Sequence, residues 1–369
     1  MRVLIVKTSS LGDVVHALPA LTDAQREIPD LLFDWVVEEA FSPIPSWHSA
    51  VIQVIPIALR RWRKAPLSKQ TRHQWHEFKH RIQAADYDLV IDAQGLLKSA
   101  WLTRMVKSTS HGLDRTSARE GLVALSYDKT HHVSKGKHAI ERVRELFAKS
   151  FDYPLPATPA EYGIYTQDPA IASRQLVFLH GTTWQSKHWP EAYWRELVKL
   201  ATNDGFQVQL PWGNDEEKAR ANRLAQNNKL AQLSPAMDLN EIASLLSCSA
   251  GAIAVDTGLG HLAAALSLPA VSIYGSTDPS LTGTRGQFQV QLSADFECAP
   301  CLRRECTYTK ESAVHPACYQ PTNPVTVWQL LHHPLNHRTN ELKTDLDTSC
   351  ERWCRIYRLT YLPSSGRCR

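Results

Sequence analysis

The sequence predicts an α/β fold built from two doubly wound, Rossmann-like domains that face each other across a cleft. Short β-branched strands alternate with polar loops and helix-length segments, a proline-rich stretch interrupts this pattern, and the pattern then starts again. A chain of 369 residues with 43% hydrophobic residues is long enough to bury two such cores. Doubly wound sheets bind ligands beyond the carboxyl ends of their strands, so we expect the functional residues there.

The first half of the chain contains three strand–loop–helix units. The predicted strands are 3–7, 33–37 and 88–91, and a polar loop follows each of them. Helix-length segments lie between the strands, as in a parallel sheet that helices cover on both faces. We assign residues 1–155 to an N-terminal domain and the proline-rich residues 156–170 to a linker.

The second half, residues 171–331, repeats the pattern and is predicted to form the C-terminal domain. The expected strands are 176–180, 207–211, 252–255 and 270–274, and the expected helices are 191–203, 215–226, 239–246 and 260–266. After residue 331 the periodicity fails. We therefore expect 332–369 to be an irregular tail without a function of its own.

Composition and the first residues argue against several classes of protein. No run of about 18 uncharged apolar residues occurs, so no transmembrane helix is expected. The first ten residues lack a small-residue cleavage site, which indicates a buried strand of a cytoplasmic protein rather than a signal peptide. A net charge of +4 is too small to indicate nucleic acid binding by itself.

Asp13 is the first candidate for catalysis. It ends the loop TSSLGD (8–13) that follows the first predicted strand. A carboxylate at the start of a helix, beside a cleft, can accept a proton from a bound hydroxyl group. Asp is also a common helix N-cap, and this is the structural alternative. In either case Gly12 allows close approach of the backbone to a neighbour.

The loop after the strand at 176–180 is a candidate phosphate site. It reads GTTWQSKHWP (181–190), in which Thr182 and Thr183 can donate hydrogen bonds and Lys187 supplies a positive charge. It lacks the second glycine of a P-loop, and no G-x-G-x-x-G follows any strand, which argues against a nicotinamide dehydrogenase. An ordinary turn before a helix is the structural alternative.

A second candidate anion site follows the strand at 252–255. This strand ends in Asp256, Thr257 and Gly258, at the start of a helix whose free amide groups attract an anion. His261 lies one turn further along and is either a ligand or a buried core residue. Two such turns in one domain favour a diphosphate over a single phosphate.

Residues 60–81 form a strongly basic stretch in the first half. Eight Lys and Arg residues stand against the single acid Glu77, and Trp62 and Trp75 are interleaved with them. A solvated helix face is the usual reason for such a run, and nucleic acid binding is a second one. Its position opposite the two phosphate turns favours an anionic acceptor or an anionic membrane surface.

Four cysteines in the second half are the one candidate for a metal site: Cys298, Cys301, Cys306 and Cys318. Four thiols can hold zinc, but the spacing of two, four and eleven residues is irregular for a zinc module, so free thiols are favoured. No D-x-D pair falls at the end of a predicted strand. We therefore expect a reaction that needs no metal ion or other cofactor.

Several motifs together resemble those of glycosyltransferase family 9, the bacterial lipopolysaccharide heptosyltransferases. The motifs are KTSSLGD (7–13), KHWP (187–190) and DTGLGH (256–261), with further similar segments at 35–39, 44–48, 60–64 and 92–95. The likeness extends from residue 1 to about 290, and motifs of both halves occur in order.

The resemblance implies a GT-B fold and an inverting transfer of L-glycero-D-manno-heptose from ADP-heptose to the first Kdo of Kdo2-lipid A, at the cytoplasmic face of the inner membrane. It implies that Asp13 is the general base and that Lys187 contacts the diphosphate. The other implied donor-site residues are Thr182, Thr183, Glu217, Met237, Asp256, Thr257, Gly258 and His261. Glu217 matches a ribose-binding acid, and its neighbour Glu216 is the alternative for this position. The implied acceptor-phosphate contacts are Arg60, Arg61, Arg63, Lys64 and Arg119.

Three alternatives stay open on the sequence alone. A transferase that adds the second heptose belongs to the same family, although the segment 35–64 argues against it. A sugar-nucleotide epimerase has the same two-domain architecture and needs no lipid acceptor. A non-enzymatic binder of anionic lipid or RNA would account for the basic stretch, but it would leave Asp13 and the two anion-binding turns unexplained.

Overall fold

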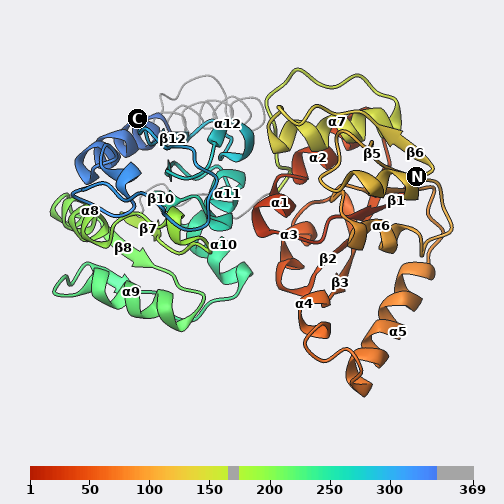
Figure 1. Ribbon diagram of the computed structural model, residues 1–369, viewed down its shortest axis with the longest axis horizontal. Coiled ribbons are helices and arrows are strands. Elements are labelled where there is room, and N and C mark those ends of the chain that lie inside the picture. Colours follow the sequence, from red (N-terminus) through yellow and green to blue (C-terminus); the bar gives the residue numbers. More distant parts are fainter. Residues whose placement is uncertain (165–173, 339–369) are drawn as a thin grey trace, which may run out of the picture.

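The computed structural model describes residues 1–164 and 174–338, and it contains one parallel six-stranded sheet in each half (Figure 1). The strand orders are β3-β2-β1-β4-β5-β6 and β12-β11-β10-β7-β8-β9. In both sheets the order reverses beside the first strand of the domain, which is the doubly wound arrangement. The predicted fold class is therefore confirmed.

The N-terminal sheet contains the strands β1 Arg2–Val6, β2 Leu32–Glu38, β3 Val51–Ile57, β4 Leu89–Asp92, β5 Ser110–Leu113 and β6 Lys129–His131. Its helices are α1 Leu11–Val15, α2 Leu18–Glu27, α3 Pro43–Ser46, α4 Leu59–Trp62, α5 Lys69–Gln83, α6 Leu97–Thr103 and α7 Ala139–Phe151, with short 3-10 turns at Glu39–Phe41 and Gly121–Ser126.

The C-terminal sheet contains β7 Gln175–Leu179, β8 Gln207–Leu210, β9 Ala231–Leu233, β10 Gly251–Val255, β11 Ala270–Tyr274 and β12 Gln289–Ser293. Its helices are α8 Glu191–Asn203, α9 Asp215–Ala225, α10 Leu239–Ser247, α11 Gly258–Ala265 and α12 Pro279–Thr282, with 3-10 turns at Gln185–Lys187 and Ala317–Tyr319.

Both faces of each sheet are buried, which explains the continuous apolar runs of the central strands. In β1, the side chains of Val3 and Ile5 pack with α2 and α7. Leu4 and Val6 point to the other face and pack with α4, α5 and α6. The alternation follows the two-residue period of a strand, so one strand contributes to two hydrophobic cores.

The structure differs from the sequence prediction in two regions. The strands β3, β5, β6, β9 and β12 were not predicted: four of them are edge strands and β5 lies next to an edge, and polar residues or a proline interrupt the apolar pattern of each. The expected start of the tail at residue 332 is also wrong, because a helix spans 324–338. Val327 and Leu331 of this helix are buried, and Leu335 packs against the same core. Pro334 lies within the helix and does not end it. Residues 339–369 lie outside the described part.

The first part of the expected linker is packed against the N-terminal domain. Arg144 of α7 is buried and donates hydrogen bonds to the main-chain oxygen atoms of Pro156 (3.4 Å) and Thr158 (3.0 Å). Ile164 forms a β-bridge with His48. The remaining linker residues, 165–170, lie outside the described part.

The two domains contact each other through α1 and α3 on one side and α10 and α11 on the other, as Figure 1 shows. Hydrogen bonds also cross this boundary: Trp47 Nε1 donates to Asn240 Oδ1 (3.0 Å), and the Tyr162 hydroxyl donates to the Arg285 carbonyl oxygen (2.8 Å). Val14 and Leu262 belong to one hydrophobic cluster that is continuous across the boundary. These contacts fix α1 opposite the start of α11.

A buried ion pair between α2 and α7 gives the first prediction. Arg144 Nε lies 2.5 Å from Asp23 Oδ2, and both side chains are at most 7% exposed. The substitution Asp23→Leu should lower the free energy of unfolding by about 3–5 kcal/mol, because the guanidinium would remain buried without a counter-charge. Urea unfolding measures this loss. The double variant Asp23→Leu/Arg144→Met should recover most of it, and equal losses in both variants would contradict the explanation.

Candidate active site

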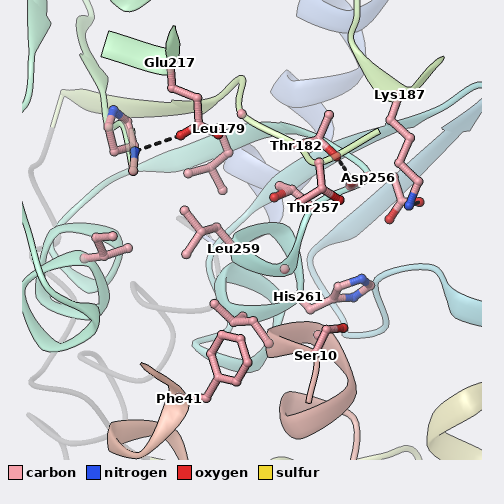
Figure 2. Close-up of a pocket in the computed structure, with 18 of the residues that line it drawn as sticks. Ser10, Phe41, Leu179, Thr182, Lys187, Glu217, Asp256, Thr257, Leu259 and His261 are labelled. Atoms are coloured by element: carbon pink, nitrogen blue, oxygen red, sulfur yellow. Dashed lines mark hydrogen bonds and ion pairs between the residues drawn. The ribbon is translucent and has the colours of Figure 1, made fainter. Parts of the chain in front are cut away.

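A cavity of about 550 Å³ lies between the two domains, beyond the carboxyl ends of β1, β7, β8 and β10. Figure 2 shows Ser10 and Phe41 approaching it from the N-terminal domain, and Glu217, Thr182, Lys187 and His261 approaching it from the C-terminal domain. This is the position in which doubly wound sheets bind their ligands. All ten residues predicted for the base and the donor site line this one cavity, although they come from five separate segments.

Asp13 reaches the cavity from the third position of α1. Its Oδ2 atom accepts hydrogen bonds from the main-chain N–H (2.7 Å) and the hydroxyl group (2.8 Å) of Ser10. Ser10 and not Asp13 is therefore the N-cap residue, which corrects the structural alternative. Gln94 supports this loop, because its Oε1 atom accepts from the N–H groups of Thr8 (3.1 Å) and Ser9 (3.2 Å).

Asp13 carries a negative charge in this environment. Burial raises the pKa of its carboxyl group. The positive charge of Lys7 and the two hydrogen bonds from Ser10 together lower this pKa by more, so the net pKa lies below the ordinary value. Lys7 is itself buried and donates to the carbonyl oxygen of Ala93 (3.0 Å). At neutral pH the side chain is thus a carboxylate that can accept a proton.

The two anion-binding turns predicted in the second half are connected through Asp256. Lys187 Nζ lies 2.7 Å from Asp256 Oδ2, and the Thr182 hydroxyl donates to the Asp256 carbonyl oxygen (3.0 Å). The hydroxyl group of Thr277 donates to the same carboxylate (2.6 Å). Lys187 also lies over the ring of Trp184, 4.5 Å from its centroid. These contacts hold the ammonium group at the edge of the cavity.

The start of α11 supplies the second set of donors. Thr257 is its N-cap residue and Gly258 its first helical residue, and both line the cavity. The first amide groups of a helix have no partner within it, and the helix dipole adds to their attraction for anions. A side chain at position 258 would place its Cβ atom 2.9 Å from Leu11 Cβ, so glycine is required for the close approach of α1.

The opposite end of the cavity suits a nucleoside. Apolar residues of the C-terminal domain that line the cavity include Leu179, Pro211, Met237, Ile242 and Leu259. Glu217 also lines it and accepts a hydrogen bond from the Gly213 N–H group (2.8 Å). Glu216 is 85% exposed instead and lies 3.6 Å from Arg220. The structure therefore distinguishes these two neighbouring acids, which the sequence alone did not.

His261 lies between the donor turns and α1, and it is in contact with a residue that the sequence analysis missed. Its Nδ1 atom lies 3.1 Å from Nε2 of His16. Burial lowers the pKa of His261 to about 4, against the opposing effect of Asp256 and Asp13, so the ring is neutral at neutral pH. The spacing of three residues between Asp13 and His16 places both on one face of a helix, and this was the available signal.

Of the five predicted acceptor contacts, only Arg60 lines the cavity. Arg61 instead forms two hydrogen bonds to the carboxylate of Glu39 (3.0 and 2.8 Å), an acid outside the basic stretch. Arg63, Lys64 and Arg119 are exposed beyond the cavity lining.

Lys98 is a further basic residue on this side that was not predicted. Its Nζ atom lies 3.4 Å from Oγ of Ser9, which belongs to the loop that carries Asp13. Burial lowers its pKa, and Arg60 and Arg63 act in the same direction. Lys98 therefore lies within electrostatic reach of both arginines, of which Arg60 lines the cavity.

The four cysteines Cys298, Cys301, Cys306 and Cys318 line a separate cavity of about 350 Å³ behind the Lys187 loop. They are free thiols, and burial with the effect of the neighbouring thiols raises the pKa of Cys318 to about 12. Within residues 1–164 and 174–338, no group of three or more Cys, His, Asp and Glu side chains is arranged to hold a metal ion. Metal-independent chemistry stays a prediction.

None of the helices in the described part of the chain is both long and apolar enough to span a membrane.

Comparison with known proteins gives consistent matches. The model of glycosyltransferase family 9 (heptosyltransferase) matches residues 75–311. Lipopolysaccharide heptosyltransferase 1 of Pseudomonas aeruginosa is 53% identical over 340 residues, which cover 89% of this chain and 96% of that protein. The protein of the same name from Escherichia coli K12 is 49% identical over 319 residues and is covered completely, with 85% of this chain aligned.

The fold also matches a solved structure of E. coli heptosyltransferase WaaC with ADP-2-deoxy-2-fluoro heptose. The TM-score is 0.78 at 45% sequence identity, and the match covers 90% of this chain and 99% of that one.

The contact between α1 and α11 gives a second prediction. In Gly12→Ala, the new methyl group would lie 2.7 Å from Cδ2 of His261, in a boundary with no space for it. The free energy of unfolding should fall by about 1–3 kcal/mol, as for other overpacked sites. The matched control is Gly136→Ala, because its methyl group would meet no atom closer than 3.7 Å. Chemical unfolding compares the two, and equal stabilities would contradict tight packing at Gly12.

Proposed function

The chain belongs to glycosyltransferase family 9, the heptosyltransferases, and we propose that it transfers L-glycero-D-manno-heptose from ADP-heptose to the first Kdo of Kdo2-lipid A. The product belongs to the inner core of lipopolysaccharide. One observation carries the proposal: a single cavity combines the Asp13 carboxylate of one domain with residues of the other. These are the apolar residues around Met237, the carboxylate of Glu217 and the two predicted anion-binding turns. The relatives' names and the bound ADP-heptose analogue of WaaC support the same donor.

The chemistry of the cavity lining supports one arrangement of the donor. The adenine ring fits the apolar end around Met237 and Leu259, and the ribose hydroxyl groups lie within reach of Glu217. The diphosphate then falls between Lys187 and the first turn of α11, where the cation and the free amide groups lie. This order leaves the heptose ring next to Asp13, at the boundary of the two domains.

The transfer is a single displacement with inversion. Asp13 accepts the proton of an acceptor hydroxyl group, and the oxygen of that group bonds to the anomeric carbon from the face opposite ADP. The bond between the anomeric carbon and the phosphate oxygen breaks, and its electron pair stays on ADP. The groups that oppose the growing negative charge are Lys187, Thr182, Thr183 and the amide groups at the start of α11.

The low pKa of Asp13 in the free protein has a consequence for the base. A carboxylate beside Lys7 is ionised but holds a proton weakly. Bound ADP-heptose brings two negative charges into the cavity, and a nearby negative charge raises the pKa of a carboxyl group. The donor therefore makes Asp13 a stronger base at the moment when a proton must be accepted.

The acceptor approaches from the N-terminal domain. Arg60 lines the cavity, Lys98 lies beside Ser9 in the loop that carries Asp13, and Arg63, Lys64 and Arg119 of the same domain are exposed. These cations suit the carboxylate and phosphate groups of a Kdo-lipid. Arg61 is held by Glu39, so its contribution requires that the acceptor displace this acid.

We also propose that this side of the protein lies on the inner membrane. Large apolar side chains are exposed on α6 and on the adjacent turn at Gly121–Ser126: Leu97, Trp101, Leu122 and Leu125. Trp101 stacks on Trp75 of the basic helix α5 (ring centroids 4.8 Å apart). Apolar residues beside a cationic helix are suited to an anionic lipid surface.

The proposed reaction is tested by its products. The purified protein is incubated with ADP-heptose and, in separate reactions, Kdo2-lipid A or its monoheptosylated form, and the products are read by mass spectrometry. Addition of one heptose to Kdo2-lipid A alone is expected. Heptosylation only of the second acceptor would assign the second-heptose reaction, and an altered donor without any acceptor would assign an epimerase.

Asp13→Asn gives the third prediction. The amide cannot accept the proton, so kcat should fall by about 10²- to 10⁴-fold, while ADP should bind as before. Steady-state kinetics and calorimetric titration with ADP measure the two quantities. In the wild type, the acid limb of kcat/KM for ADP-heptose due to this group should lie below the ordinary pKa of an aspartate, because Lys7 and Ser10 lower the pKa of Asp13 in the free protein. Near-normal turnover of the variant would refute the assignment of Asp13 as the general base.

Membrane binding gives the fourth prediction. Sedimentation with vesicles that contain anionic lipids should exceed that with neutral vesicles and should weaken as salt is added. The variant Leu122→Ser/Leu125→Ser should bind several-fold less. Leu302→Ser is the matched control, because this leucine is 61% exposed on the other domain. Equal binding by both variants would place the membrane surface elsewhere.

A further inference from the structure

A pair of buried histidines joins the two domains directly behind the catalytic carboxylate. His16 is the residue after α1, and His261 lies in α11. Nε2 of His16 and Nδ1 of His261 are 3.1 Å apart, and the rings meet edge to face with centroids separated by 4.4 Å. Both side chains are at most 6% exposed.

Neither ring is charged at neutral pH. Burial lowers the pKa of His16 well below its ordinary value, and it lowers the pKa of His261 to about 4. A hydrogen bond between two neutral imidazole rings has one donor and one acceptor, and each ring carries its single proton on one of its two nitrogen atoms. The direction of this bond therefore decides which nitrogen of His261 bears the proton.

The surroundings of His16 favour one direction. Among the described residues, Nδ1 of His16 is buried and has no hydrogen-bond partner. If His16 accepted at Nε2, its only proton would be on Nδ1, and a buried N–H group would be left without an acceptor. If His16 donates from Nε2, Nδ1 is an unpaired acceptor. Buried N–H groups without a partner are rarer in native structures than under-satisfied acceptors.

The neighbouring His138 shows how a fixed tautomer is built in this region. Its Nδ1 atom accepts from the Ile140 N–H group (3.2 Å), so its proton is on Nε2, which lies 2.9 Å from the Gly283 carbonyl oxygen. Its ring centroid lies 5.6 Å from that of His16. The ring of His138 is thus held by main-chain atoms of both domains and offers His16 no alternative acceptor.

We propose that His16 is a positioning residue that holds His261 in the tautomer with its proton on Nε2. This nitrogen lies beside Gly12, 3.4 Å from where a Cβ atom would be, and both residues line the cavity. The N–H group then serves as a donor to the diphosphate or to a hydroxyl group of the heptose, which is the part that rests on the proposed function. The opposite tautomer would present a lone pair to the negatively charged ligand.

The bond also makes donor binding depend on the contact between domains. His261 belongs to the domain that binds the nucleotide, but the residue that fixes its proton belongs to the domain that carries Asp13. The Nε2–H group of His261 is therefore held in place only while α1 is packed against α11. The domain that binds the acceptor thus completes the binding site for ADP-heptose.

The proposal is tested with a conservative and a disruptive substitution. In His16→Gln, the side-chain amide has an N–H donor the same number of bonds from Cα as Nε2 of histidine, so it can still donate to His261. His16→Leu has a similar size and no donor. Loss of such a supporting hydrogen bond should reduce kcat/KM for ADP-heptose by about 10–100-fold in His16→Leu, and His16→Gln should recover most of it.

The spectroscopic readout does not depend on activity. Nitrogen NMR of protein labelled at histidine distinguishes protonated from unprotonated ring nitrogens, and His261→Gln identifies the signals of His261. The wild type and His16→Gln should show an Nε2–H tautomer, and His16→Leu a mixture of tautomers. The control is His48→Gln, because His48 is equally buried in the same domain but bonds to Thr22 (3.0 Å) away from the cavity.

Three outcomes would overturn the proposal. The first is an Nδ1–H tautomer of His261 in the wild type. The second is an unchanged tautomer in a folded His16→Leu, with folding checked by thermal unfolding. The third is a loss of kcat/KM in His48→Gln as large as that in His16→Leu. If the wild type bound ADP but transferred no heptose, the function would fail while the tautomer result would still decide the role of His16.

Discussion

The close packing of α1 against α11 is the constraint on which the rest of the site depends. Two glycines make it possible, because a Cβ atom at Gly12 or Gly258 would lie within 3 Å of an atom of the opposite domain. The contact places the first turn of α1 next to the first turn of α11. A carboxylate from one domain thereby faces the anion-binding amide groups of the other, across a space that a sugar ring can occupy.

The two domains present different charges to this space: the C-terminal domain presents an ion pair, and the N-terminal domain presents a carboxylate. In the C-terminal domain, the cation Lys187 is held by Asp256, so the turn stays nearly balanced until a diphosphate arrives. In the N-terminal domain, Asp13 is stabilised as an anion by Lys7 and Ser10. In the proposed reaction, an anionic donor fits the first environment and raises the basicity of the second. The same ligand charge would then serve both for binding and for activating the base.

Much of the sequence that resembles the family supports the site rather than lining it. The segment 92–95 is an example: Asp92 is buried and accepts from the Tyr127 hydroxyl group (2.7 Å), while Gln94 holds the loop before Ser10. The basic stretch is similar in part, because Arg61 is neutralised by Glu39 and Trp75 stacks on Trp101. A sequence motif therefore identifies a region of the fold. Some of its residues stabilise that region, and others line the cavity.

The sequence by itself determined the fold class and the long central strands and helices, because these follow from local signals: apolar runs of a length set by the sheet, and polar turns at strand ends. It also singled out ten residues for the base and the donor site, of which Glu217 and Met237 came only from the resemblance to the family, and the structure brings all ten to one cavity. Only the tertiary structure decided between Glu216 and Glu217, paired Arg61 with Glu39, extended the last helix through Pro334, and brought His16 to His261. Each of these depends on a partner distant in the chain, and the spacing of residues along a sequence carries no information about such a partner.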